Sequence, residues 1–78
     1  MRKLGKTQRL VLENVRAGRW PYAGHRDYAE YSRRDAVAHQ LMKRGLLKLL
    51  PPGHPLILER QGNPWLLTPE GAVVLESA

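Results

Sequence analysis

The stretch from Ser32 to Leu47, SRRDAVAHQLMKRGLL, constrains the fold of this 78-residue chain most, because both of its ends carry helix signals. Ser32 and Asp35 form an S-x-x-D pattern, in which a side-chain oxygen accepts a backbone N–H that the first helical turn leaves unpaired. Gly45 follows two cations, an order typical of a helix end, because cations stabilise the negative end of the helix dipole. The sequence therefore predicts one capped helix over residues 32–44.

The side chains of this segment divide into an apolar face and a basic face. The apolar positions recur at helical spacing and predict a buried stripe of Val37, Ala38 and Leu41, flanked by Met42. The other positions are predicted to face mainly outward: Arg33, Arg34, Ala36, His39, Gln40, Lys43 and Arg44. Arg33 and Arg34 fall in the predicted first turn, where the helix dipole disfavours cations. Two explanations are open: a helix that inserts this end into a DNA groove, and an ordinary solvated helix end.

The positive charge is concentrated in the first two-thirds of the chain. Residues 1–48 hold twelve Lys and Arg against four Asp and Glu, a net charge of +8, whereas residues 49–78 carry −2. A basic region of this kind favours nucleic acid or another polyanion as partner. The chain has no cysteine, so neither a disulfide nor a thiolate metal site stabilises its thin core. We expect one domain over residues 1–78, in the reducing cytoplasm.

The remaining segments predict helices around a short hairpin. Pro21 and Gly24 interrupt residues 19–30, whose aromatic side chains we expect to pack in or beside the core. Thr7 and Thr68 are the predicted caps of the first and last helices, and Gly18 is the predicted end of the first. The predicted elements are a helix over 7–16, a short helical segment over 25–31, the helix over 32–44, a strand beginning in 46–50, a turn over 51–55, a hairpin of 56–59 with 64–68, and a helix from Pro69.

Two local patterns give this order of elements a resemblance to a known family. Residues 41–47, LMKRGLL, are similar to the L-x-x-x-G-L-[VLI] passage from a recognition helix into a wing, and residues 67–71, LTPEG, to the L-T-x-x-G that closes the wing. The chain therefore resembles winged helix-turn-helix domains, most closely small bacterial or phage regulators of the multiple-antibiotic-resistance type. The resemblance implies an α+β fold in which helices are followed by a β-hairpin wing and a C-terminal helix. Residues 19–31 depart from it, since they leave little room for the family's second helix.

The resemblance also implies which residues contact DNA. The helix over 32–44 would enter the major groove, and the wing would contact phosphates or the minor groove. The residues that would face the groove are Ser32, Arg33, Arg34, Ala36 and Gln40, with Lys43 better placed for phosphate. Arginine can read guanine and glutamine can read adenine through paired hydrogen bonds. The wing candidates are His54, Arg60, Gln61 and Asn63.

Three functional hypotheses follow. The first is a small transcriptional regulator that binds double-stranded DNA, for which the resemblance and the thin core imply a homodimer on a two-fold site. The second is a winged-helix protein-interaction module, such as a phage-encoded inhibitor of a host nucleic-acid machine. The third is non-specific binding of RNA or DNA, with bases stacking on Trp20 or Tyr22.

Other classes find little support in the sequence. No nucleophile elbow, phosphate loop or dinucleotide fingerprint is present, so we expect no enzyme and no cofactor. His25, His39 and His54 match no compact metal-ligand spacing, and we expect no metal site. Asp27 and Glu30 are interpreted as an ordinary solvated helix face rather than an acid/base pair. The longest apolar stretch, residues 46–58, is broken by charge and proline, so no membrane span is predicted. The N-terminus lacks the apolar core of a signal peptide.

Overall fold

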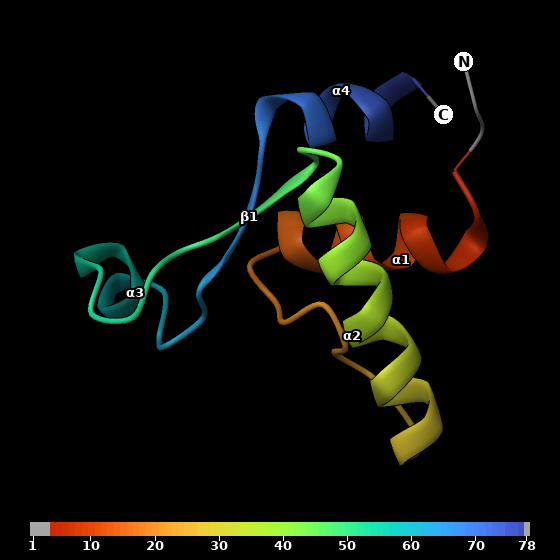
Figure 1. Ribbon diagram of the computed structural model, residues 1–78, viewed down its shortest axis with the longest axis horizontal. Coiled ribbons are helices and arrows are strands. Elements are labelled where there is room, and N and C mark those ends of the chain that lie inside the picture. The colour runs from red at the N-terminus through yellow and green to blue at the C-terminus, as the bar shows by residue number, and fades with distance from the viewer. Residues whose placement is uncertain (1–3, 78) are drawn as a thin grey trace.

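Four helices and one antiparallel strand pair make up residues 4–77, the part of the chain that the computed structural model describes (Figure 1). The elements are α1 (Lys6–Arg16), α2 (Tyr28–Lys43), β1 (Leu47–Leu49), α3 (Pro55–Glu59), β2 (Trp65–Leu67) and α4 (Pro69–Ser77). The predicted α+β class is confirmed. In Figure 1, α1, α2 and α4 gather around one end of the strand pair, and α3 lies at its other end, away from those helices.

Helix α1 places one apolar stripe in the core. Val11, Leu12 and Val15 are buried and meet residues of α2, β2 and α4 in a single cluster. The predicted end at Gly18 is confirmed, because this residue takes a φ of 82°, which glycine adopts without steric cost. The predicted cap is wrong: Gly5, not Thr7, precedes the helix, and its backbone N–H donates to the Gln8 side chain at 2.9 Å.

Helix α2 begins four residues earlier than predicted. Asp27 is its N-cap, and the carboxylate accepts the backbone N–H of Glu30 at 2.8 Å. The predicted start at Ser32, and the separate short helix before it, are therefore wrong, because the D-x-x-E of residues 27–30 supplies an earlier cap of the same kind. Arg33 and Arg34 consequently lie in the second turn, where the dipole effect has decayed. The predicted end is confirmed, with Gly45 at a φ of 81°.

The two strands form a short ladder that joins α2 to α4. β1 pairs with β2 in antiparallel register, with Leu47 opposite Leu67 and Leu49 opposite Trp65. The turn predicted over residues 51–55 is present, but residues 56–59, predicted as a strand, belong to helix α3. Pro55 occupies the first helical turn, and the His54 ring accepts the Leu56 N–H at 3.1 Å. A short apolar run is compatible with either a strand or a helix. Here the helix forms because Pro55 and His54 provide helix-start signals.

The L-T-P-E-G segment closes the fold by close packing. The Thr68 hydroxyl donates to the Gly45 carbonyl at 2.7 Å and accepts the Gly71 N–H at 3.0 Å, which confirms Thr68 as the cap of α4. A Cβ on Gly71 would lie 2.2 Å from the Leu46 carbonyl oxygen. Only glycine therefore allows α4 to pack this closely on the start of the strand pair.

Candidate nucleic-acid interface

One solvent-facing stripe runs along α2 and carries no carboxylate. Its members recur every three or four residues and are all exposed: Ala29, Ser32, Arg33, Ala36, Gln40, Lys43 and Arg44. The polar and charged side chains among them form no hydrogen bond or ion pair with any other described residue. Within α2, the acidic residues Glu30 and Asp35 lie off this stripe and pair with Arg34 and His39. We call this set of seven residues the α2 stripe.

Arg34 is the exception among the predicted contact residues of this helix. Its side chain is only 12% exposed, so the expectation that it faces outward is wrong. Nη1 donates to the Ala23 carbonyl at 2.8 Å, and Nη2 pairs with the Glu30 carboxylate. Spacing explains the burial, because Arg34 lies four and seven residues before Ala38 and Leu41 and so continues their inward face. Arg34 braces the start of α2 against the preceding turn.

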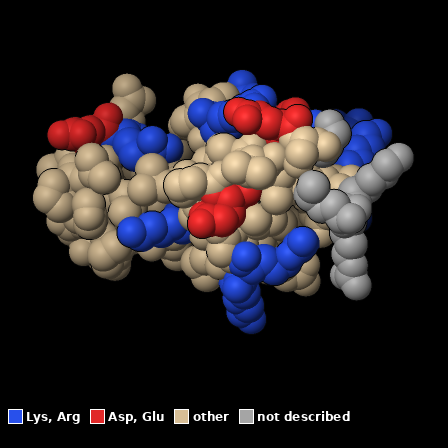
Figure 2. All heavy atoms as spheres, turned by 90° about the horizontal axis from the view of Figure 1, so that it is seen from above, with Lys and Arg blue, Asp and Glu red and all other residues tan. Residues whose placement is uncertain are grey.

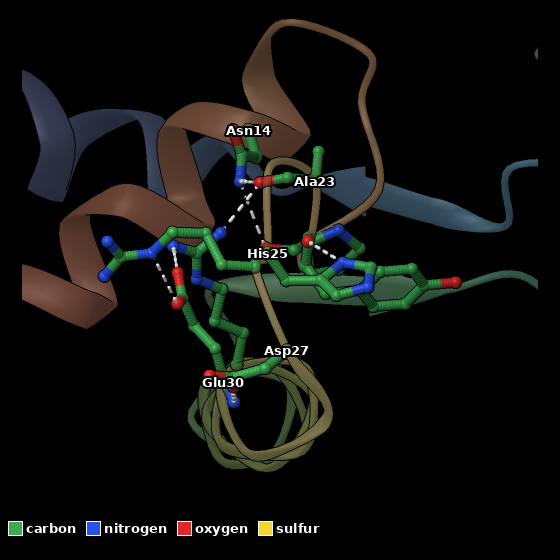
Figure 3. A network of polar contacts seen from close by, with 9 residues as sticks. Asn14, Ala23, His25, Asp27 and Glu30 are labelled. Carbon is green, nitrogen blue, oxygen red and sulfur yellow. Dashed lines mark hydrogen bonds and ion pairs between the residues drawn. The ribbon is translucent and has the colours of Figure 1, made fainter.

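A polar network holds that turn where a winged helix-turn-helix would have its second helix (Figure 3). Buried Asn14 donates to the carbonyls of Pro21 and Ala23 at 3.1 and 3.3 Å, and its own carbonyl accepts from Arg19 Nε at 3.2 Å. The Ala23 carbonyl accepts from both Asn14 Nδ2 and Arg34 Nη1, and Figure 3 shows Asn14 and Ala23 facing each other. Side chains therefore satisfy carbonyl groups that a helical ladder would otherwise pair. Sequence reasoning missed the role of Asn14.

Asn63, a predicted wing contact, instead binds the backbone just after α1. The side chain is buried at 2% exposure, and Nδ2 donates to the Gly18 carbonyl at 3.1 Å. Its oxygen accepts the Trp65 N–H at 3.0 Å. Asn63 thus joins the turn to β2 and does not face solvent, which corrects its prediction as an exposed wing residue.

The connection between β1 and β2, predicted as the wing, offers little cationic surface. Arg60 is the only Lys or Arg in the connection over residues 50–64, and its Nη2 donates to the Trp65 carbonyl at 2.9 Å. Its Nε is buried without a hydrogen-bond partner among the described residues. His54 is half-buried as the cap of α3, and Gln61 is exposed. The structure therefore does not bring the predicted wing residues together with the α2 stripe.

The tip of the wing is apolar instead. Leu58 on α3 is 85% exposed, and Leu56 and Leu49 are also exposed. Figure 2 shows this end of the molecule, on the left, as mostly uncharged surface with an acidic and a basic group at its upper edge. This end of the strand pair therefore exposes several leucine side chains.

Aromatic rings pack in a row along the turn and the start of α2. Ring centroids lie 5.6 Å apart for Trp20 and Tyr22, 4.4 Å for Tyr22 and Tyr31, and 6.1 Å for Tyr31 and Tyr28. The expectation of core-edge packing holds for Tyr22 and Tyr31, which are half-buried, whereas Trp20 and Tyr28 are exposed. Burial, with added effects from Tyr31 and Asp35, raises the pKa of the Tyr22 phenol above its ordinary value.

The fold and this surface define a small α+β protein with a basic, carboxylate-free helical stripe. No family model matches the chain, and neither a curated protein nor a solved structure shows significant similarity to it. Among residues 4–77, no helix is long and apolar enough to cross a membrane. Within the same residues, no group of three His, Asp or Glu side chains is placed to hold a metal ion.

Proposed function

We propose that the protein binds double-stranded DNA by placing the α2 stripe in the major groove, as a small transcriptional regulator. The observation that carries the proposal is the stripe itself, which has three cations, two polar side chains and no carboxylate. The major groove of B-form DNA admits an α-helix, and the small side chains of Ala29, Ser32 and Ala36 allow close approach of the helix backbone to base edges.

The side chains of the stripe suit different parts of a duplex. Arg33 has two donors for the acceptors of a guanine edge, and Gln40 has a donor and an acceptor that match an adenine edge. Lys43 and Arg44, at the end of the helix, suit backbone phosphates as mobile cations. The exposed methyl group of Ala36 suits a thymine methyl. The proposal includes a homodimer on a palindromic site, because helix-turn-helix regulators commonly bind two half-sites as dimers.

The proposed docking differs from that of a winged helix-turn-helix domain in one respect. Arg60 is engaged with the Trp65 carbonyl and His54 caps α3, so the connection over residues 50–64 lacks a free cation for phosphate. Binding would therefore depend on α2 and on the cations near its start.

Fluorescence polarisation with a random duplex at two salt concentrations tests the proposal. Each phosphate neutralised adds about −0.9 to the slope of log affinity against log salt. Lys43→Gln should reduce the slope by about 1, whereas Lys48→Gln, an exposed lysine on β1 outside the stripe, should leave it unchanged. Absence of duplex binding by the wild-type protein at low salt would contradict the proposal.

Protein binding through α3 is the second candidate function. The exposure of Leu56 and Leu58 at the end of the strand pair favours it. The partner would need an apolar pocket, because leucine side chains are exposed at this end and the connection over residues 50–64 carries no net charge. Such binding would make the chain a protein-interaction module, and it would leave the α2 stripe free.

A further inference from the structure

A surface hollow of about 280 Å³ separates the first turns of α1 from the first turns of α2. Four cations and one carboxylate line it: Lys6, Arg26, Arg33, Arg34 and Glu30. Its volume lies just below the range of drug-sized ligand pockets, which begins at about 300 Å³, so the hollow suits a small ligand. The hollow lies beside the α2 stripe and shares Arg33 with it.

The charges around the hollow do not balance. Glu30 is already occupied, since Arg34 pairs with one of its oxygens and Arg26 Nε lies 3.3 Å from the other. Lys6 and Arg33 have no ion pair or hydrogen bond to any described residue. Four cations around one carboxylate leave a net charge of +3 around the hollow, which favours the binding of an anion.

We infer that this hollow binds a phosphate group between Lys6 and Arg33. Guanidinium and ammonium groups are the strong donors to phosphate oxygens, and the hydroxyl of Thr7, which also lines the hollow, adds a neutral donor. Arg34 is fixed to the Ala23 carbonyl, so one wall of the site is formed before the ligand arrives. If the proposed function holds, the phosphate belongs to the DNA backbone beside the groove that α2 occupies, and this assignment of its source rests on that function. A free phosphate has the same chemistry and is the other source.

Nuclear magnetic resonance with inorganic phosphate as the probe tests the site without DNA. Phosphate should shift the backbone amide signals of Lys6 and Thr7 and the Nε–Hε signal of Arg26. The Lys6→Gln/Arg33→Gln variant should lose these shifts. The matched control Lys48→Gln/Arg16→Gln removes the same charges at exposed positions outside the hollow and should keep them. No shift in the wild-type protein, or equal shifts in both double variants, would overturn the inference.

A duplex titration then identifies the source of the phosphate. If the duplex shifts the same signals, and Lys6→Gln lowers the salt slope by about 1 while Lys48→Gln does not, the occupant is a backbone phosphate. If inorganic phosphate shifts them and the duplex does not, the site is upheld for a free phosphate. Substitutions at Lys43 and Ala36, outside the hollow, test the proposed function separately, so either proposal can fail alone.

Discussion

The start of α2 and the tip of the wing, at α3, present opposite chemistry to solvent. The first carries the unpaired Arg33 and small side chains, and a partly buried network of Asn14, Arg34 and Glu30 braces it from behind. The second carries exposed Leu56 and Leu58 and no free cation. A winged helix that used both ends on DNA would need cations at both. The difference is the reason that the proposed DNA contact is assigned to α2 alone and not to the α3 end.

The largest expected effect is on stability, at the contact of Gly71 in α4 with Leu46. Gly71→Ala places a methyl group against the Leu46 carbonyl oxygen, so α4 must move away from the strands. Overpacking of this kind costs about 3 kcal/mol of the free energy of unfolding. Urea denaturation followed by tryptophan fluorescence measures it. Glu70→Ala, at an exposed neighbouring position, should cost about 0.5 kcal/mol. Equal effects of the two substitutions would contradict the close packing described for α4.

The neighbouring arginines of α2 should separate stability from binding. Arg34→Ala removes the contacts to Ala23 and Glu30. We expect the free energy of unfolding to fall by about 2 kcal/mol, less than for a fully buried pair because Arg34 and Glu30 are partly exposed. Arg33→Ala should change stability by less than about 0.5 kcal/mol and weaken duplex binding by about 1–3 kcal/mol. Urea denaturation and fluorescence polarisation of both variants measure the two effects. A larger loss of stability for Arg33→Ala than for Arg34→Ala would contradict the assignment of the brace to Arg34.

The smallest expected effect lies at the wing tip. Leu58→Ser alters a side chain that is 85% exposed, so stability should change by less than about 0.5 kcal/mol. Duplex affinity should stay within about twofold of the wild type, because the tip lies outside the proposed groove contact. A tenfold loss of affinity on polarisation would show that the wing takes part in DNA binding and would remove the contrast between the two ends.

Local signals predicted much of the fold. The ends of α1 and α2, the turn over residues 51–55 and the cap of α4 depend on glycine, proline and threonine acting on adjacent backbone, so the sequence alone reveals them. The start of α2 was mispredicted because two cap patterns compete, Asp27 with Glu30 and Ser32 with Asp35, and only the first is used. The helical identity of α3 was also missed, because a short apolar run fits helix and strand equally.

Part of the candidate site could also be predicted, because helical periodicity is a local signal. Ser32, Arg33, Ala36, Gln40 and Lys43 lie on the exposed stripe that helical periodicity predicts. The inward position of Arg34 could have been found from its spacing to Ala38 and Leu41. The roles of Asn14 and Asn63 could not have been found from the sequence. Their carbonyl partners lie in the segment after α1, whose path is set by tertiary contacts, and Asn63 reaches Gly18 across 45 residues of chain.

A carboxylate placed in the middle of the α2 stripe tests the central claim most directly. Ala36→Glu adds one negative charge at an exposed helical position, and Val73→Glu adds the same charge on exposed α4. Both variants should fold, which circular dichroism checks. Polarisation with a random duplex at low salt should show at least about tenfold weaker binding for Ala36→Glu, about 1.4 kcal/mol, and wild-type binding for Val73→Glu. Equal duplex affinity of the two variants would contradict the claim that the α2 stripe contacts DNA.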